Sequence, residues 1–332
     1  MSIASEVQQG RGELVSVVVA AHNAEAWITG VVDAIRAQTY EQLEIVVVDD
    51  GSSDRTRDLV ASMQQLEPRL RLIAARHGGT AHTVTRGLHA ATGAVVCLIS
   101  HDCYAVSDWV ERVIVGFSDP DVGIVRGPVL PAREILVPFF HCMVVDHDSV
   151  SFDGVCIAYR ATALDAAGRY FEPALSRNGD DADLGWRIVD LGYRHVWLTD
   201  PTAYHDVVPR SFWSGIRASG GVFRFALLVR AHPGMRSHLR LGFLWGGRAR
   251  YAKVALLHAA VILAAIGQLR PAAVLAVLLL AATVVDGAHS SLSAKLRLRD
   301  RLLTVPLEKL LRDVVGSYAL AYGSIRYRSL VF

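Results

Sequence analysis

The chain has 332 residues, 52% of them hydrophobic, and its 34 Lys and Arg nearly balance its 32 Asp and Glu. This length suits one large domain with an accessory region, and the balanced charge gives no reason to expect nucleic acid as a partner. Four scattered cysteines without a C-x-x-C pair argue against a zinc site and against a disulfide framework.

Strands and helices alternate along the first hundred residues. Short apolar runs predict strands, and amphipathic stretches between them predict helices. The predicted strands are 14–20, a strand that begins at residue 43, 70–74 and 94–99. The predicted helices are 26–38, 56–65 and 83–91. This alternation predicts an α/β fold with a mostly parallel sheet flanked by helices, which is a Rossmann-like arrangement.

Carboxylates follow two of these strands. Asp49 and Asp50 end the run L-E-I-V-V-V-D-D, and Asp102 follows the strand 94–99. Ligands bind beyond the carboxyl ends of strands in such sheets, so we expect these side chains to face one crevice. The alternative is an ordinary strand–turn–helix junction, in which Ser52 or Ser53 caps the next helix.

The order of these segments resembles a family 2 glycosyltransferase of the GT-A fold. The resemblance rests on A-A-H-N-A-E, V-V-D-D-G-S-S-D-R-T, G-G and A-T-G-A-V-V-C-L-I-S-H-D, and it extends from about Leu14 to Arg230. It implies inverting transfer from a nucleotide-activated sugar. The donor-binding residues that it implies are Ala20, His22, Asn23, Glu25, Asp49, Asp50, Gly51, Ser52, His77, Gly79, Ser100, His101 and Asp102.

The resemblance also implies a divalent cation, Mg or Mn, as a cofactor. Asp102 matches the last Asp of the D-x-D segment that holds this cation in the family, whereas Ser100 replaces the first Asp. His205 lies where family members often carry a histidine that reaches the metal, although an isolated histidine can equally be a hydrogen-bonded loop residue. The Ser-x-Asp version and the run I-V-R-G-P-V-L-P-A-R-E are similar to rhamnosyltransferase-like members.

Three aspartates begin a predicted helix in the second half of the region. The run D-D-A-D-L-G-W-R resembles the family's base segment, which implies Asp181 as the general base and Asp180 as second candidate. Simple capping of the helix N-terminus is the alternative. We expect Asp183 to be structural and to pair with Arg187 one turn on. Gly154, Arg217 and Arg224 are candidate contacts for the acceptor or the diphosphate.

The composition changes toward the C-terminus. From Arg230 onward the chain carries 15 Lys and Arg but 4 Asp and Glu, together with the apolar runs 254–267 and 272–285. Basic residues outside both runs favour a membrane hairpin, about 251–287, with both ends in the cytoplasm. We expect an interfacial helix at about 305–326. A buried soluble helix pair is the alternative.

The sequence therefore predicts a catalytic domain at 10–230 and an α-helical membrane-attachment region at 231–332. The predicted activity is transfer of one sugar from a nucleotide sugar to a hydroxyl of a lipid-linked or glycan acceptor, on the cytoplasmic side of the cell membrane. Two alternatives remain: a polyprenyl-phosphate glycosyltransferase, and a non-catalytic membrane scaffold that binds nucleotide sugar.

Overall fold

The computed structural model describes residues 12–149, 151–176, 179–200, 202–244, 248–290 and 295–331. Contacts divide the chain into two units. The first comprises Met1–Ala132 and Met143–Asp206, and the second comprises Arg133–Cys142 and Val207–Phe332.

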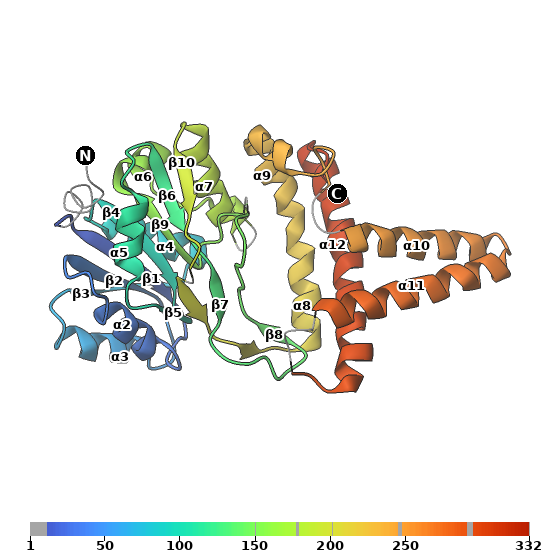
Figure 1. Ribbon diagram of the computed structural model, residues 1–332, viewed down its shortest axis with the longest axis horizontal. Coiled ribbons are helices and arrows are strands. Elements are labelled where there is room, and N and C mark those ends of the chain that lie inside the picture. The colour runs from blue at the N-terminus through green and yellow to red at the C-terminus, as the bar shows by residue number, and fades with distance from the viewer. Residues whose placement is uncertain are drawn as a thin grey trace. The chain divides into compact units, whose positions relative to one another are not determined.

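A mostly parallel sheet forms the centre of the first unit (Figure 1). Its strand order is β10-β6-β9-β4-β1-β2-β3, and β9 runs antiparallel to both of its neighbours. The strands are β1 (Val15–Ala21), β2 (Leu43–Asp50), β3 (Leu70–Ala75), β4 (Val95–Ser100), β6 (Val122–Arg126), β9 (Cys156–Arg160) and β10 (Arg194–Trp197). A smaller sheet joins β5 (Cys103–Ala105), β11 (Ala203–His205) and β7 (Val129–Pro131).

Helices cover both faces of the large sheet. The helices are α2 (Ile28–Arg36), α3 (Thr56–Gln64), α4 (Thr80–Ala90), α5 (Trp109–Gly116), α6 (Ala161–Ala167) and α7 (Asp180–Asp190), with the short η1 (Pro173–Leu175). Successive strand side chains point to opposite faces. Val17 and Val19 share a core with Ile28 and Val31 of α2. Gly87 of α4 lies over Val18 on the other face, where a Cβ would come within 2.3 Å of that side chain.

The predicted elements of the first hundred residues are present, with small differences at their ends. Helix α4 begins at Thr80 rather than at residue 83, and β4 ends at Ser100. The predicted capping of α3 by Ser52 or Ser53 is wrong. Asp54 Oδ1 accepts the Thr56 N–H at 3.0 Å, because the turn places Ser52 Oγ against the backbone N–H of Asn23.

Helices dominate the second unit. They are α8 (Phe212–Ser219), η2 (Gly220–Arg224), α9 (Phe225–Ala231), η3 (Pro233–His238), α10 (Arg248–Ala265), α11 (Leu269–Ser290), the π-helical turn η4 (Asp300–Thr304) and α12 (Val305–Tyr327), with β8 (Phe140–His141) paired to β12 (Val208–Pro209). A Cβ at Gly323 of α12 would lie 2.1 Å from the Phe223 oxygen, so α12 packs closely on η2. Residues 207–230 thus pack with the C-terminal helices, whereas the sequence predicts a boundary near residue 230.

Helices α10 and α11 lie side by side as a hairpin (Figure 1). The segment Leu269–Gly287 is long and apolar enough to cross a membrane, and 17% of it is buried. Apolar side chains near the tip and along both helices are between 59% and 66% exposed: Val261, Ile262, Ile266, Val274, Val277 and Leu280. The described residues of this unit therefore do not bury the pair.

A buried ionic cluster joins the base of this hairpin to α12. Lys253 is fully buried, and its Nζ lies 2.5 Å from Asp286 Oδ2 and 2.6 Å from Asp313 Oδ2. Lys309 Nζ also contacts Asp286, at 3.2 Å. One lysine thus neutralises carboxylates on two different helices.

Replacing Lys253 by Met should therefore destabilise the second unit. The substitution leaves Asp286 and Asp313 without their central partner, and breaking a buried ion pair costs about 3–5 kcal/mol. The exposed pair of Lys295 with Glu134 provides a control, because Lys295→Met should cost at most about 1 kcal/mol. Denaturant unfolding in detergent measures both variants, and equal losses would contradict the structural role of Lys253.

Candidate active site

Two strand ends with carboxylates flank β1 at one edge of the sheet. β1 pairs in parallel with β2 on one side and with β4 on the other. Asp49 and Asp50 end β2, and Asp102 comes two residues after the end of β4. Asp49 is 1% exposed and Asp50 is 3% exposed, so the carboxylates are held within the edge rather than projecting from it.

Asp50 fixes the loop between β3 and α4. Its carboxylate accepts the N–H groups of Gly78 at 2.8 Å and of Gly79 at 3.0 Å. Burial opposes its ionisation, but hydrogen bonds from Gly78, Thr83 and Gly79 outweigh this effect and hold the pKa of Asp50 below its usual value. Gly51 has φ +66°, and a Cβ there would lie 2.8 Å from the His77 nitrogen, so only glycine permits this approach.

His22 and His77 stack beside Asp50. Their ring centroids are 4.4 Å apart, and both Nδ1 atoms face the backbone oxygen of Asp50, at 2.9 and 3.2 Å. His77 Nδ1 also lies 2.9 Å from Asp50 Oδ2. These groups offer ligand-type atoms within 4.8 Å of one another. Both Nδ1 atoms meet the same backbone oxygen, which can only accept hydrogen bonds, so the arrangement fits N–H donation to Asp50 better than lone-pair donation to a metal.

Asn23 and Glu25 tie the loop after β1 to the turn after β2. Asn23, which has φ +49°, accepts the Ser53 N–H through Oδ1 at 2.9 Å. Glu25 Oε2 accepts the N–H of Arg55 at 2.9 Å. Ser52 Oγ accepts the Asn23 N–H at the same distance. The predicted donor residues of both segments are thus brought together, and they order each other's loops.

Asp102, which follows β4, lies beside His205, which ends β11. His205 is 1% exposed, and its Nε2 is 3.5 Å from Asp102 Oδ1. The other ring nitrogen, Nδ1, lies 2.7 Å from the backbone oxygen of Asp206, so the tautomer with N–H at Nδ1 keeps Nε2 as the ligand-type atom beside Asp102. Metal-binding histidines commonly donate their second N–H to a carbonyl in this way, so the pair fits a divalent cation. Neighbouring His101 contacts the Ala20 oxygen through Nδ1, at 3.1 Å.

Asp181 is the carboxyl group at this edge whose pKa departs furthest from its ordinary value. It lies in the first turn of α7, largely shielded from solvent, beside the buried Asp180. Burial, together with the negative charges of Asp180 and Asp153, raises the pKa of Asp181 to about 7. The N–H of Gly154 donates to Asp181 Oδ2 at 2.9 Å and partly offsets this shift. A base with such a pKa is half ionised near neutrality, where general bases work best.

Backbone contacts link Asp181 to the strand end that carries Asp102. The N–H of Ser100 donates to the Val155 oxygen at 2.9 Å, and Val155 directly follows Gly154. Asp183 is used differently, because its Oδ2 pairs with Arg187 Nε at 2.9 Å. This confirms the predicted structural pair, and it distinguishes Asp183 from Asp180 and Asp181, the other two carboxylates in the first turn of α7.

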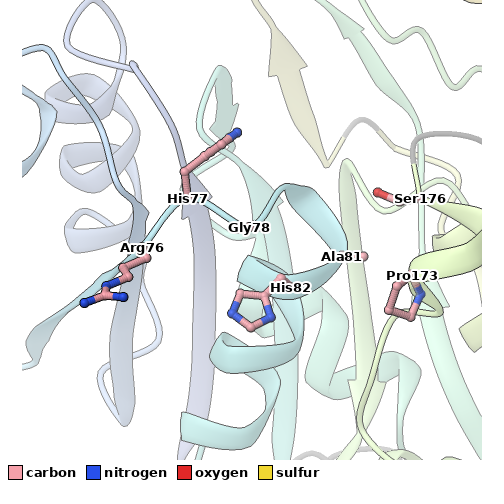
Figure 2. A pocket seen from close by; sticks show the side chains of 7 residues that line it. All are labelled: Arg76, His77, Gly78, Ala81, His82, Pro173 and Ser176. Atoms are coloured by element: carbon pink, nitrogen blue, oxygen red, sulfur yellow. The ribbon is translucent and has the colours of Figure 1, made fainter.

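A pocket of about 340 Å³ opens at the start of α4. Figure 2 shows Pro173 and Ser176 across from the loop that carries His77 and Gly78, with His82 at the first turn of the helix. The size falls in the range of small-molecule sites. Gly79, the predicted donor residue beside it, has φ +84° and precedes α4.

Arg217 and Arg224 belong to the second unit, on α8 and η2. Arg224 stacks over the Phe223 ring with 4.7 Å between its guanidinium carbon and the ring centroid. Their role toward a diphosphate stays a prediction. Asp153 and Gly78 were not among the predicted site residues; their predicted neighbours Gly154 and Gly79 were the signals that the sequence offered for them.

Residues 16–137 match the model of the family described as glycosyl transferase family 2. These residues are thus similar to the family 2 glycosyltransferase domain. A glycosyltransferase of Haemophilus influenzae is 34% identical over 102 residues, which are 30% of this chain and 32% of that protein. The glucosyl-dolichyl phosphate glucuronosyltransferase of Haloferax volcanii is 31% identical over 120 residues, covering 35% and 38%. The chain thus spans about a third of the length of these curated relatives.

Solved structures are similar in fold over a longer part of the chain. The mannosyltransferase PcManGT from Pyrobaculum calidifontis, solved with GDP-Man and Mn2+, aligns with a TM-score of 0.63 at 23% identity. The alignment covers 93% of this chain and 87% of that one. The likeness shows the fold, which is the predicted α/β GT-A fold followed by a helical C-terminal region.

Proposed function

We propose that the protein is an inverting glycosyltransferase that moves one sugar from a nucleotide sugar to an acceptor hydroxyl, with Asp181 as general base. The observation that carries the proposal is the carboxyl group of Asp181, with a pKa of about 7, connected through Gly154 and Val155 to the strand end of Asp102. An acceptor hydroxyl needs a group that takes its proton as it attacks the anomeric carbon. Asp181 is suited to that task, because burial and the charge of Asp180 keep its pKa near neutrality.

The donor would lie at the carboxyl ends of β1, β2 and β4. Loops fixed by Asp50, Asn23 and Glu25 surround this edge, and the pocket beside Gly78 offers room for a ligand. Asp102 and His205 would hold the divalent cation, which offsets charge on the leaving diphosphate when bound. The rhamnosyltransferase-like run at 124–134 makes a deoxyhexose one candidate sugar.

A lipid-linked acceptor is part of the proposal. Its support is the exposed apolar hairpin of α10 and α11 and the name of the Haloferax volcanii relative, which describes an enzyme acting on a glucosyl-dolichyl phosphate. The catalytic unit would then work at the cytoplasmic face of the membrane. A transfer to the lipid phosphate itself would not need Asp181, because a phosphate is already ionised.

A panel of nucleotide sugars tests the donor site. Thermal unfolding with and without Mn²⁺ or Mg²⁺ identifies the donor, since a ligand at 100 times its Kd stabilises the protein by about 2.7 kcal/mol. Release of free sugar or formation of product with any stabilising donor excludes a non-catalytic scaffold. The absence of stabilisation by every nucleotide sugar would overturn the proposal.

Asp102→Asn should weaken donor binding when Mn²⁺ is present. Mutation of a residue that only hydrogen-bonds to a metal ligand typically lowers metal affinity or activity by about 10–100-fold. Loss of a ligand itself should therefore raise the donor Kd at least about tenfold. Titration calorimetry measures the change. The control is Asp108→Asn, at an exposed aspartate paired with Arg112. An unchanged Mn²⁺-dependent affinity in Asp102→Asn would show that the cation binds elsewhere.

A further inference from the structure

The connection between β8 and β9 carries the N–H group that contacts Asp181. Residues 148, 149 and 151–154 of this connection are called the base loop below. Within it, Ser151 Oγ lies 2.6 Å from Ser149 Oγ and donates to Asp153 Oδ2 at 2.7 Å. Gly154 follows directly and donates its N–H to Asp181. A Cβ at Gly154 would lie 3.2 Å from that of Asp181, so the approach is close.

The buried guanidinium of Arg126 holds the other end of the base loop. Arg126 ends β6 and is 2% exposed. Its Nη2 donates to Asp148 Oδ1 at 2.5 Å and to the Ser149 oxygen. The guanidinium carbon lies 4.9 Å from the centroid of the Phe152 ring and 5.4 Å from that of Trp197. The second oxygen of Asp148 contacts His195 Nε2 at 3.0 Å.

Helix α7 holds the middle of the base loop. Phe152 is 1% exposed and has φ +46°, which is strained for a residue other than glycine. A Cβ at Gly185 of α7 would come within 2.3 Å of the Phe152 ring, and Trp186 meets that ring edge-on at 6.0 Å. The loop is therefore clamped between Arg126 and the helix that carries Asp181.

Burying a guanidinium is costly, and this cost is not offset by hydrogen bonds at two of its three nitrogens. Nε and Nη1 of Arg126 have no hydrogen-bond partner in the described part of the chain. An apolar side chain could fill the space between Phe152 and Trp197 at lower cost. The two bonds from Nη2 are what such a replacement could not supply, and both go to the base loop.

We propose that Arg126 is a positioning residue for Asp181: it fixes the base loop so that the Gly154 N–H stays on the carboxylate. This inference rests on the proposed function, in which Asp181 is the base. The carboxylate is also faced by Asp180 on α7, Asp153 on the loop and Tyr159 on β9. The Gly154 N–H opposes the two negative charges, so it favours the ionised form that accepts a proton.

Arg126→Met should lower kcat about tenfold or more, because the base loses its orientation. The acid limb of the pH–rate profile should move up by about one pH unit as the Gly154 bond is lost. The KM for the donor should not change, and neither should the increase in Tm that the donor produces. Arg126→Lys should restore part of kcat and of the acid limb, since its ammonium keeps a charged donor for Asp148 and the Ser149 oxygen although it cannot stack on the two rings.

Arg160→Met is the matched control. Arg160 belongs to the neighbouring strand β9, donates to the oxygens of Phe117, Asp119 and Val122, and stacks on the Phe117 ring at 5.3 Å. It pairs with Val95 at the start of β4, at the edge of the sheet away from Asp102. The control should lower Tm without moving the acid limb.

Ser151→Ala is a milder test if Arg126→Met does not fold, because it loosens the loop without burying or removing a charge. The same direction of change in kcat and in the acid limb is expected. An unmoved acid limb in a folded variant, or an equal movement in Arg160→Met, overturns the inference. Full activity of Asp181→Asn would overturn the proposed function instead, so the two failures are distinguishable.

Discussion

Asp181→Asn should abolish most of the sugar transfer while the protein still folds and binds its donor. The substitution keeps the shape of the side chain and an oxygen that can accept the Gly154 N–H, but it removes the proton acceptor. Loss of a general base typically lowers the rate by a factor of about 10²–10⁴. Single-turnover assays with the purified variant measure the loss. Asp180→Asn is the matched variant, because it removes the neighbouring charge and leaves the base in place.

The pH dependence separates these roles. Transfer by the wild type should rise about tenfold per pH unit below pH 7 and level off above it, since ionised Asp181 is the active form. In Asp180→Asn the acid limb should move to lower pH, because a charge that raises the pKa of Asp181 is gone. Wild-type turnover in Asp181→Asn would instead favour transfer to a lipid phosphate, which needs no base.

Stability should change in the opposite direction from activity. The folded state raises the pKa of Asp181 from 3.8 to about 7, so between these values it holds a proton that the unfolded chain releases. Stability is therefore lost as pH rises through this window. Asp181→Asn lacks this loss and should be more stable than the wild type at pH 8, by an amount on the order of 4 kcal/mol. A lower Tm at pH 8 would mean that the variant is inactive for structural reasons.

The sheet and its edge could be predicted from the sequence because their signals are local. Unbroken β-branched runs such as Ile45–Val48 are typical of strands buried on both faces, and the carboxylates that follow them mark the edge. The Asp183–Arg187 pair follows from helical spacing. The point where α8 gives way to the 3-10 turn η2 cannot be placed from the sequence, although Gly220 and Gly221 lie there, because glycine weakens a helix without fixing where it stops.

The uses of the individual side chains could not be read in the same way. Asp50 was assigned to donor binding, and its carboxylate is occupied by N–H groups 28 and 29 residues away. The stack of His22 on His77 joins two loops that are separate in sequence. Arg126 appeared only within a run that resembles family members. Each of these contacts depends on tertiary structure, which periodicity and spacing do not encode.

Excision of the helical hairpin should convert a membrane-bound protein into a soluble one. Both helices present apolar side chains to their surroundings, and basic residues follow at 295–301. Replacing residues 257–282 by a short glycine-rich turn removes this surface and retains Lys253 and Asp286 at the hairpin base, with their contacts to α12. Truncation after Arg240 would be a poorer test. It removes α12, whose Gly323 packs against Phe223 and whose Tyr327 oxygen accepts a bond from Arg230.

Fractionation of cells that express the full chain or the excised chain measures the effect. The full chain should sediment with membranes, and high salt should release only part of it. Each basic residue near an anionic leaflet contributes about 1 kcal/mol, which salt screens, whereas burial of apolar surface persists. The excised chain should remain in the supernatant and keep donor-induced stabilisation. In a control variant, Ile262 and Ile266 are both changed to Lys, which retains the hairpin but charges its tip. This variant should be released from membranes at a lower salt concentration than the full chain. Full-length protein in the soluble fraction without detergent would contradict insertion, and the lipid-linked acceptor would then lose its structural support.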